Sequence, residues 1–267
     1  MVSVRSIDVH FLPALVAPTA LSGSVAVIID ILRASSTIAT ALQNGARRIF
    51  PCGTPGDAFE LRRQFSEAQP SASDTLLLGG EREGVRISGF DLGNSPAEYG
   101  TEVVSGRSLA FTTTNGTRAL LAAEDAAEIV IGAFVNITAL SQRLIASGRP
   151  IHLICAGTNG QVTGEDVLFA GAMVATLSGD GRQRDAVQAT LSDSARIAQG
   201  FWNSVAQGES SRAELSERVH QALSLSHGGR NLAALGYHAD ITLCSALDSV
   251  SVVPQFDRQQ RSLVAAP

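Results

Sequence analysis

The fold is decided by residues 25–36, which read Val-Ala-Val-Ile-Ile-Asp-Ile-Leu-Arg-Ala-Ser-Ser. The apolar, mostly β-branched run 25–29 predicts a buried strand, because no polar residue interrupts it before Asp30. Helical spacing follows over 37–44, and Gly45 can end that helix. This sequence of strand, polar loop and helix is the unit from which α/β folds are built.

The same unit recurs further along the chain. Apolar runs at 75–78, 109–111 and 151–154 each pass into a loop rich in glycine, hydroxyl or charged residues. A strand is also expected over 128–134 and a helix over 166–177. We therefore predict an α/β layered fold with a largely parallel or mixed central sheet and helices on both faces. Ligands of such sheets bind outside the carboxyl ends of the strands, so the polar loops should converge on one edge.

The chain is expected to form one α/β region over 1–253, followed by a flexible tail over 254–267 that is polar and then rich in small residues. An internal boundary near residue 178 stays open. From 179 to 225 the composition turns rich in Arg, Glu, Gln, Ser and Ala with helical spacing, which predicts an extra helical layer. The run 241–244 is expected to be the last strand.

Composition narrows the classes of function. The 267 residues are 45% hydrophobic, enough to bury a large core, and the formal net charge is -5. This balance argues against nucleic acid or an anionic membrane as a partner. All 20 basic residues are arginine, because the sequence contains no lysine. The absence of lysine excludes Schiff-base chemistry and the Walker A phosphate loop.

Cysteine usage and the N-terminal residues predict a cytoplasmic protein. Cys52, Cys155 and Cys244 are widely spaced and odd in number, which argues against a disulfide framework or a CxxC zinc site. The first fifteen residues contain charged and polar side chains where a signal peptide needs an apolar core, and no apolar run approaches a membrane span. The sequence leaves a homo-oligomer open.

Asp30 and Arg33 are the first candidate site residues. A carboxylate at a strand end suits a hard cation, and an arginine three residues later can clamp a phosphate oxygen. The alternative is that Asp30 caps the helix and Arg33 lies on the surface. Two more carboxylates, Glu81 and Asp91, stand between glycines, where a backbone can approach a ligand closely. Ordinary turns would explain these two as well.

The run 112–118 supplies hydroxyl groups and an Asn-Gly turn before a predicted helix, so its free N–H groups would cradle an anion without lysine. A threonine-rich strand ending in a turn is the alternative reading. The loop from Cys155 lacks the arginine of a cysteine phosphatase, because Gln161 stands at that position. At the next helix, Glu165 and Asp166 either bind metal or complement the helix dipole. The loop 227–230 either binds an anionic group or connects two helices.

Taken in order, these loops resemble the 2-phosphosulfolactate phosphatase family over about residues 25–253. The segments that carry the resemblance are Ile29 to Thr37, Gly79 to Arg82, Gly89 to Pro96, Thr112 to Thr117, and Cys155 to Gly157 with Glu165 and Asp166. Ser35 and Ser36 stand where the family often has threonines, which leaves the hydroxyl chemistry intact. The resemblance implies a Mg²⁺-dependent phosphatase acting on phosphate esters of 2-hydroxy acids, with 2-phospho-3-sulfolactate as the namesake substrate.

On this basis we expect hydrolysis of a small phosphorylated 2-hydroxy acid with Mg²⁺ as cofactor. The alternative is a non-catalytic module that binds a small phosphorylated or sulfonated metabolite. The expected metal ligands are Asp30, Glu81, Asp91, Glu165 and Asp166, of which Asp30, Glu81 and Asp91 are also expected to be catalytic together with Arg33. The expected substrate-binding residues are Ser35, Thr114, Asn115, Gly116, Thr117, Arg118, His227 and Arg230.

Three groups compete for the attack on phosphorus. A water activated by Mg²⁺ needs no covalent residue. Asp30 could form an aspartyl phosphate, but the usual second aspartate is missing because Leu32 occupies its position. Cys155 is the third candidate. We expect the water mechanism and no phosphoenzyme.

Overall fold

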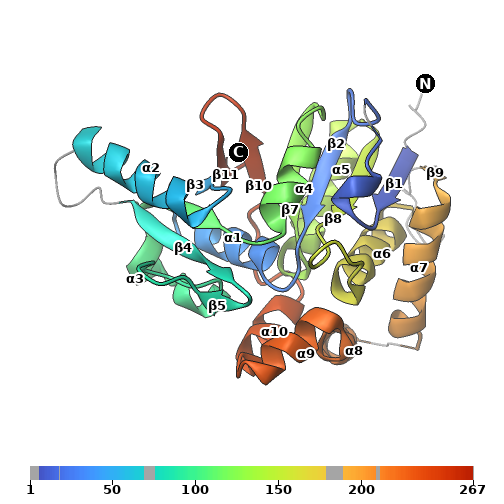
Figure 1. Ribbon diagram of the computed structural model, residues 1–267. Helices are drawn as coiled ribbons and strands as arrows, with labels where there is room; N and C mark the ends of the chain where they lie inside the picture. The colour runs from blue at the N-terminus through green and yellow to red at the C-terminus, as the bar shows by residue number, and fades with distance from the viewer. Residues whose placement is uncertain (1–5, 18, 69–75, 179–188, 209–210, 267) are drawn as a thin grey trace.

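The computed structural model describes residues 6–17, 19–68, 76–178, 189–208 and 211–266 (Figure 1). The strands in this part of the chain are β1 (Ser6–His10), β2 (Val25–Ile29), β3 (Arg48–Pro51), β4 (Leu77–Arg82), β5 (Val85–Arg86), β6 (Ser108–Thr112), β7 (Glu128–Gly132), β8 (Ile151–Cys155), β9 (Thr190–Leu191), β10 (Pro254–Asp257) and β11 (Ser262–Ala265). The α-helices are α1 (Ala34–Gln43), α2 (Pro55–Ala68), α3 (Thr101–Val104), α4 (Gly116–Ala122), α5 (Ile137–Ser147), α6 (Gly164–Ser178), α7 (Asp193–Ala206), α8 (Arg212–Leu225), α9 (His227–Ala234) and α10 (His238–Ser245).

These strands form one mixed sheet in the order β5-β4-β6-β3-β11-β10-β7-β2-β8-β1-β9. Two groups within it are parallel. One consists of β4, β6 and β3, and the other runs from β7 through β2, β8 and β1 to β9. The hairpin of β10 and β11 joins the two groups and pairs antiparallel with both. The predicted α/β class with a mixed central sheet and helices packed on it is confirmed.

The C-terminal residues differ from the prediction of a flexible tail over 254–267. Residues 254–257 and 262–265 are strands in the middle of the sheet, where Gln255 pairs with Val130 and Leu263 pairs with Ile49. Leu263 is buried. Four-residue strands with mixed polarity give little signal in the sequence, and here the tertiary partners on both sides decide the structure.

The expected strand over 241–244 is also wrong, because this run lies in α10. Ile241 and Cys244 are both buried, and a spacing of three places them on one helix face. A short apolar run does not distinguish a buried helix from a strand. The predicted helical layer after residue 178 is present as α7 to α10, of which α8, α9 and α10 lie together below the sheet in Figure 1.

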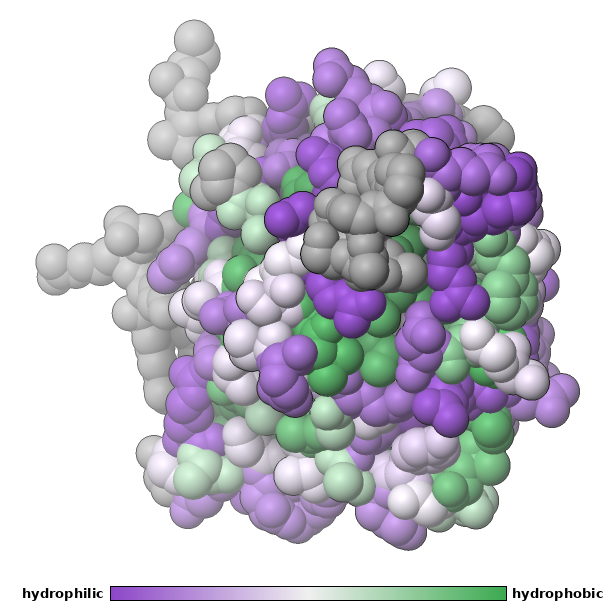
Figure 2. All heavy atoms as spheres, turned by 90° about the vertical axis from the view of Figure 1, so that its left-hand side faces the viewer, coloured by the Kyte–Doolittle hydropathy of each residue, from purple (hydrophilic) through white to green (hydrophobic). Residues whose placement is uncertain are grey.

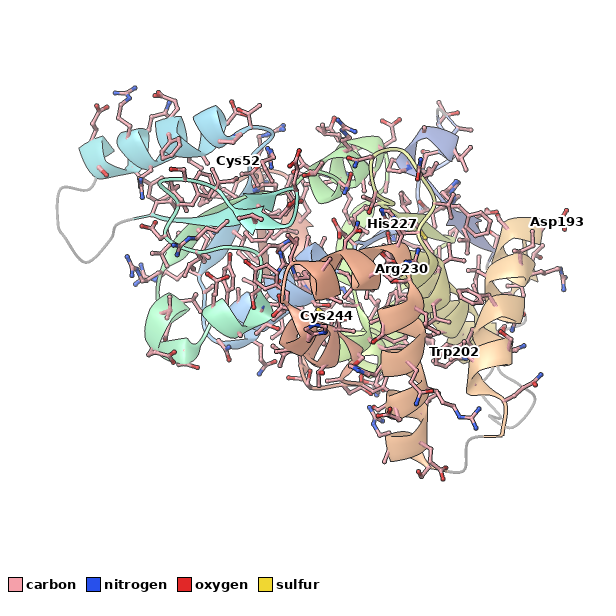
Figure 3. All side chains as sticks on the ribbon, turned by 60° about the horizontal axis from the view of Figure 1, so that its bottom comes forward. Cys52, Asp193, Trp202, His227, Arg230 and Cys244 are labelled. Carbon is pink, nitrogen blue, oxygen red and sulfur yellow. The ribbon has the colours of Figure 1, made fainter. Side chains whose placement is uncertain are left out.

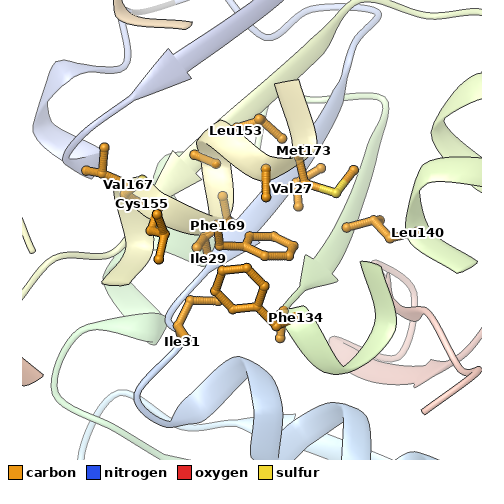
Figure 4. Close-up of a cluster of buried hydrophobic side chains, with 14 of the residues drawn as sticks. Val27, Ile29, Ile31, Phe134, Leu140, Leu153, Cys155, Val167, Phe169 and Met173 are labelled. Carbon is orange, nitrogen blue, oxygen red and sulfur yellow. The ribbon is translucent and has the colours of Figure 1, made fainter. Parts of the chain in front are cut away.

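Strand β2 is buried on both faces, which explains its unbroken apolar sequence. Val27 and Ile29 face a core that includes side chains of α5, α6 and α7, whereas Ala26 and Ile28 face a core with α1 and α4. In the first core, the rings of Phe134 and Phe169 meet edge to face at 5.1 Å between centroids (Figure 4). This packing fixes the position of Asp30 at the end of the strand.

The surface of the molecule is mixed in polarity on the face that carries α2 and α3. Hydrophilic side chains separate the apolar areas on that face (Figure 2). None of the described helices is both long enough and apolar enough to cross a bilayer.

Candidate active site

A cleft of about 490 Å³ lies where the loops after β2, β4, β6 and β8 meet helix α9. Its polar lining residues are Asp30, Arg33, Glu81, Glu83, Asn94, Thr113, Thr114, Asn115, Thr158, Asn159 and Asn231. Leu32, Leu232 and Leu235 form an apolar part of the wall. Polar loops from four strand ends therefore converge as the sequence predicted, and five of the predicted site residues line the cleft: Asp30, Arg33, Glu81, Thr114 and Asn115.

The convergence does not follow from a single parallel edge, because β2 belongs to one parallel group and β4 and β6 belong to the other. A small cavity of about 30 Å³ beneath Asp30 shows how the groups meet. Ile28 of β2, Ile49 of β3 and Phe111 of β6 line it together, with Leu263 of the C-terminal hairpin. Strands from both groups therefore face the same small space, and their loops reach the same cleft.

Asp30 follows β2 directly and lines both cavities. Burial raises the pKa of its carboxyl group to about 7, with further contributions from the negative charges of Glu81 and Glu165. The backbone N–H of Ala34 at the start of α1 opposes this shift by donating to the carboxylate. Asp30 thus accepts a hydrogen bond from the start of α1 and also lies near two other carboxylates, while its role as a metal ligand stays a prediction.

Glu81, near the end of β4, is a buried carboxylate whose two oxygens have protein partners. Its Oε1 accepts from the N–H and the hydroxyl of Thr114, each at 3.1 Å. Its Oε2 accepts from the N–H of Gly84 at 2.7 Å. Gly84 has a φ of +81°, a conformation that favours glycine, and this turn forms part of the wall of the cleft. Glu81 therefore connects the β4–β5 turn to the loop after β6.

Glu165 and Asp166 begin α6 and are both buried. The Oε2 atom of Glu165 has no hydrogen-bond partner among the described residues, and its Oε1 lies so close to Gly228 that a Cβ there would be 2.3 Å away. Asp166 is different, since its two oxygens accept from the N–H groups of Ile31 at 2.9 Å and Gly157 at 3.0 Å. Asp166 therefore joins two loops, whereas one oxygen of Glu165 stays without a hydrogen-bond partner in the part of the chain that the structure describes.

Arg33 lines the cleft, and only 3% of its surface is exposed, which rules out the surface position considered from the sequence. Its Nη1 donates to Oδ2 of Asp240 at 2.6 Å, and its Nη2 donates to the carbonyl of Gly84 at 2.7 Å. The guanidinium also lies over the ring of Tyr237, 4.5 Å from the ring centre. Arg33 is thus held on several sides and keeps a fixed orientation.

The predicted anion cradle is divided by the structure. Thr114 and Asn115 line the cleft, and Oδ1 of Asn115 accepts from the N–H of Asn159 at 3.2 Å. The other residues of the cradle, and Ser35, which was also predicted to bind substrate, lie elsewhere. Ser35, Gly116 and Thr117 line the small cavity beneath, and Arg118 is exposed and lines neither cavity.

Asp91 does not join the cleft. Its Oδ2 accepts from the N–H of Leu78 at 2.8 Å and from Arg62 at 3.1 Å, so it ties its own loop to β4 and α2. The sequence placed it with Glu81 because both stand between glycines, but this pattern does not indicate which side of a strand a loop occupies.

His227 and Arg230 lie on the first turn of α9 (Figure 3). The side chain of His227 contacts Asn231, and Nη1 of Arg230 donates to the carbonyl of Leu225 at the end of α8. Neither lines the cleft, whereas Asn231 does. The 227–230 segment is therefore not a loop but the start of α9, and Ser226 is the residue between α8 and α9.

Cys155 ends β8 and is fully buried. Burial raises the pKa of its thiol well above the usual range, with contributions from Asp166 and Glu165. A thiol in this environment stays protonated and is a poor nucleophile. This agrees with the missing loop arginine.

Three residues that sequence reasoning missed contribute to the site. Asp240 of α10 and Tyr237, the residue before α10, both contact Arg33. Asn94 lines the cleft, and its buried Oδ1 has no hydrogen-bond partner among the described residues. Asn94 stands in a glycine-rich segment that suggested function, so a signal was present. Nothing in the sequence connects Asp240 with Arg33.

The donor set suits a hard cation. Within the described residues, no group of three or more His, Cys, Asp or Glu side chains is arranged to hold a metal ion. Mg²⁺ does not require such a group, because it takes one or two carboxylates and fills the remaining positions with water and phosphate oxygens. Asp30 and the unpartnered oxygen of Glu165 meet that requirement, and a cation would relieve the repulsion among the carboxylates.

Comparisons with known proteins identify the family of this chain. The family of 2-phosphosulpholactate phosphatases matches residues 10–259. A protein of Symbiobacterium thermophilum is 36% identical over 240 residues, which cover 90% of this chain and 94% of its own. A protein of Pseudothermotoga lettingae is 37% identical over 250 residues, covering 94% and 95%. Both are named as probable 2-phosphosulfolactate phosphatases.

The match extends over nearly the whole chain, and includes every loop that lines the cleft. It confirms the resemblance that these loops carry in the sequence. The chain therefore belongs to the 2-phosphosulfolactate phosphatase family, a family of phosphoric monoester hydrolases.

Proposed function

We propose that this protein hydrolyses a phosphate monoester of a small 2-hydroxy acid, of which 2-phospho-3-sulfolactate is the first candidate, and that it uses Mg²⁺. The observation that carries the proposal is a cleft lined by Asp30 and Arg33 in a chain of this family. The buried carboxylate of Glu165 lies beside Gly228, which lines the cleft, and its negative charge helps to raise the pKa of Asp30. Carboxylates that lack a cation partner together with a fixed guanidinium form an environment suited to a phosphate group with a divalent cation.

Asp30 and Glu165 are the residues that would hold Mg²⁺. The ion would neutralise charge on the phosphate oxygens and lower the pKa of the attacking water. Glu81 and Asp166, which were also predicted as ligands, have both of their oxygens engaged by the protein and act by fixing loops. Asp91 is not proposed as a ligand.

The protein groups have distinct roles toward the ester. Arg33 binds phosphate oxygens through N–H donors that its protein contacts leave free. Asn115 lines the same cleft and orients the ester, and Leu32 and Leu235 limit the access of water. Without a cation the pKa of the Asp30 carboxyl group is about 7, and bound Mg²⁺ would lower it, so Asp30 would hold the ion as a carboxylate. Water attacks the phosphorus, and no phosphoenzyme forms.

The test is phosphate release from a panel of phosphorylated 2-hydroxy acids between pH 5 and 8, measured with Mg²⁺ and again with EDTA. We expect release that depends on Mg²⁺, with the largest kcat/KM for one member of the panel. Tight binding of these compounds with no turnover and no effect of metal would instead support a non-catalytic binding module.

A further inference from the structure

The strongest unexplained feature of the cleft is the ion pair between Arg33 and Asp240. The side chains are 2% and 3% exposed, and the Nη1 to Oδ2 distance is 2.6 Å. Removing two charges from water is unfavourable, and a buried pair often gives no net stability over an apolar pair of the same size. Its presence at the wall of a cleft therefore suggests a role in geometry.

Asp240 is itself held by a second contact. The hydroxyl of Ser95 donates to its Oδ1 at 2.6 Å, while Oδ2 receives Arg33. Ser95 is in turn fixed at the start of a short 3-10 helix, where it caps Ala97. Ser95 thus fixes the carboxylate of Asp240, and this carboxylate in turn fixes Arg33.

The remaining contacts of Arg33 come from different parts of the fold. The carbonyl of Gly84 accepts from Nη2, and the ring of Tyr237 covers one face of the guanidinium. An arginine has five N–H donors in a rigid plane, so anchoring Nη1, Nη2 and one face determines where the other donors point. Arg33 lines the cleft, so its orientation decides which donors face an anion bound there.

We propose that Asp240 is a positioning residue of this active site: through its ion pair it sets the orientation in which Arg33 binds the phosphate of the substrate. The proposal rests on the proposed function. Asp240 does not touch the ester, and it acts through Arg33 alone. Helix α10, which carries Asp240, is far in sequence from the loops of the cleft and becomes part of the catalytic apparatus.

A double-mutant cycle tests this inference. The variants are Asp240→Asn, Arg33→Met and the combination of the two, each measured for kcat, KM, competitive inhibition by inorganic phosphate and thermal unfolding. We expect Asp240→Asn to lower kcat/KM by about 10- to 100-fold and to weaken phosphate inhibition similarly. In the Arg33→Met variant, adding Asp240→Asn should change neither kcat/KM nor the inhibition by phosphate, because the residue through which Asp240 acts is gone.

The melting temperature should respond differently from activity in the double variant. This difference separates a positioning role from a purely structural one. Arg33→Met leaves the carboxylate of Asp240 buried without its cation, so adding Asp240→Asn should raise the melting temperature while activity stays low. Ser95→Ala is a milder test that keeps the charge, and should weaken phosphate inhibition about threefold. Glu60→Gln is the matched control, because Glu60 pairs with Arg63 at the same 2.6 Å on an exposed helix face.

Unchanged phosphate inhibition in both Asp240→Asn and Ser95→Ala, with a wild-type protein that turns over, would overturn the positioning role and leave the proposed function standing. If the double variant regained activity together with its melting temperature, the positioning role would also be overturned and the proposed function would stand. A wild-type protein that neither turns over phosphate esters nor binds phosphate would overturn both.

Discussion

The Oδ1 atom of Asp166 accepts a hydrogen bond from the backbone N–H of Ile31 at 2.9 Å. Its other oxygen accepts from the N–H of Gly157 at 3.0 Å, so one carboxylate joins the loop after β2 to the loop after β8. The two loops meet at the carboxyl ends of neighbouring strands, and Asp30 stands in the first of them. The geometry of the cleft therefore depends on a residue that does not line it.

Replacing Asp166 by asparagine should disturb this junction. An amide has one acceptor oxygen, so one of the two N–H groups would face the NH₂ group and lose its partner. We expect a loss of about 1–3 kcal/mol in the free energy of unfolding. Denaturant melts measure this loss, and a kcat reduced at least tenfold should accompany it. A variant with wild-type stability and activity would show that the loops are held by other contacts.

Asp30 should make the metal-free protein less stable at high pH. Its pKa is raised to about 7 in the folded state, from an ordinary value of 3.8, so the folded protein keeps a proton that the unfolded chain has lost. The stability of the wild type should therefore rise as the pH falls from 8 through 7 toward 5.

The comparison with Asp30→Asn isolates this effect, because asparagine keeps an acceptor for the N–H of Ala34 and carries no charge. In EDTA at pH 8 we expect the variant to be more stable than the wild type by about 1–3 kcal/mol, a difference that shrinks as the pH falls toward 5. Urea melts at both pH values measure it. A difference that is independent of pH would contradict the assigned titration.

Cys155 should be dispensable for chemistry. Its thiol is fully buried and has a raised pKa, so we expect Cys155→Ser to retain substantial activity. Acid quenching during turnover followed by mass spectrometry should find no phosphate on the protein. Phosphate on Asp30 would overturn the water mechanism, and an inactive but folded, metal-binding Cys155→Ser would restore the thiol as a candidate.

The C-terminal hairpin should be essential for the fold. Leu263 of β11 is 2% exposed and lines the small cavity beneath Asp30. We expect Leu263→Ala to lower the free energy of unfolding by about 2–5 kcal/mol. Its neighbour Val264 is only partly buried, so Val264→Ala should lower it by less than half as much. Equal, small losses in both variants would show that the hairpin contributes little to the core.

The sequence predicted the parts of the fold that depend on local pattern. The run 25–29 is apolar throughout and is a strand buried on both faces, as expected. The hairpin at 254–265 could not be predicted in the same way, because its short strands exist through partners from β3 and β7. The run 241–244 was ambiguous because so short a stretch of largely apolar residues occurs in buried strands and in buried helices alike.

In the candidate site too, local pattern predicted some residues, whereas others depend on tertiary packing. Asp30, Glu81 and Thr114 were predicted from loops that follow strands, and the structure brings them to one cleft. Asp91 was assigned on equal grounds and lies outside it. The pairing of Arg33 with Asp240 spans 207 positions and arises only from tertiary packing. Local pattern identifies polar loops at strand ends, but not which side chain finds a buried partner.

The most direct test of the central claim is Mg²⁺-dependent phosphate release from 2-phospho-3-sulfolactate by the wild type and by Glu165→Gln. Glu165 is the buried carboxylate with an unpartnered oxygen, and Glu124→Gln on the exposed surface is the control. We predict turnover that EDTA abolishes, a Mg²⁺ requirement raised at least tenfold in Glu165→Gln, and a control like the wild type. Turnover that is unaffected by EDTA, or Glu165→Gln with the Mg²⁺ dependence of the wild type, would contradict the account.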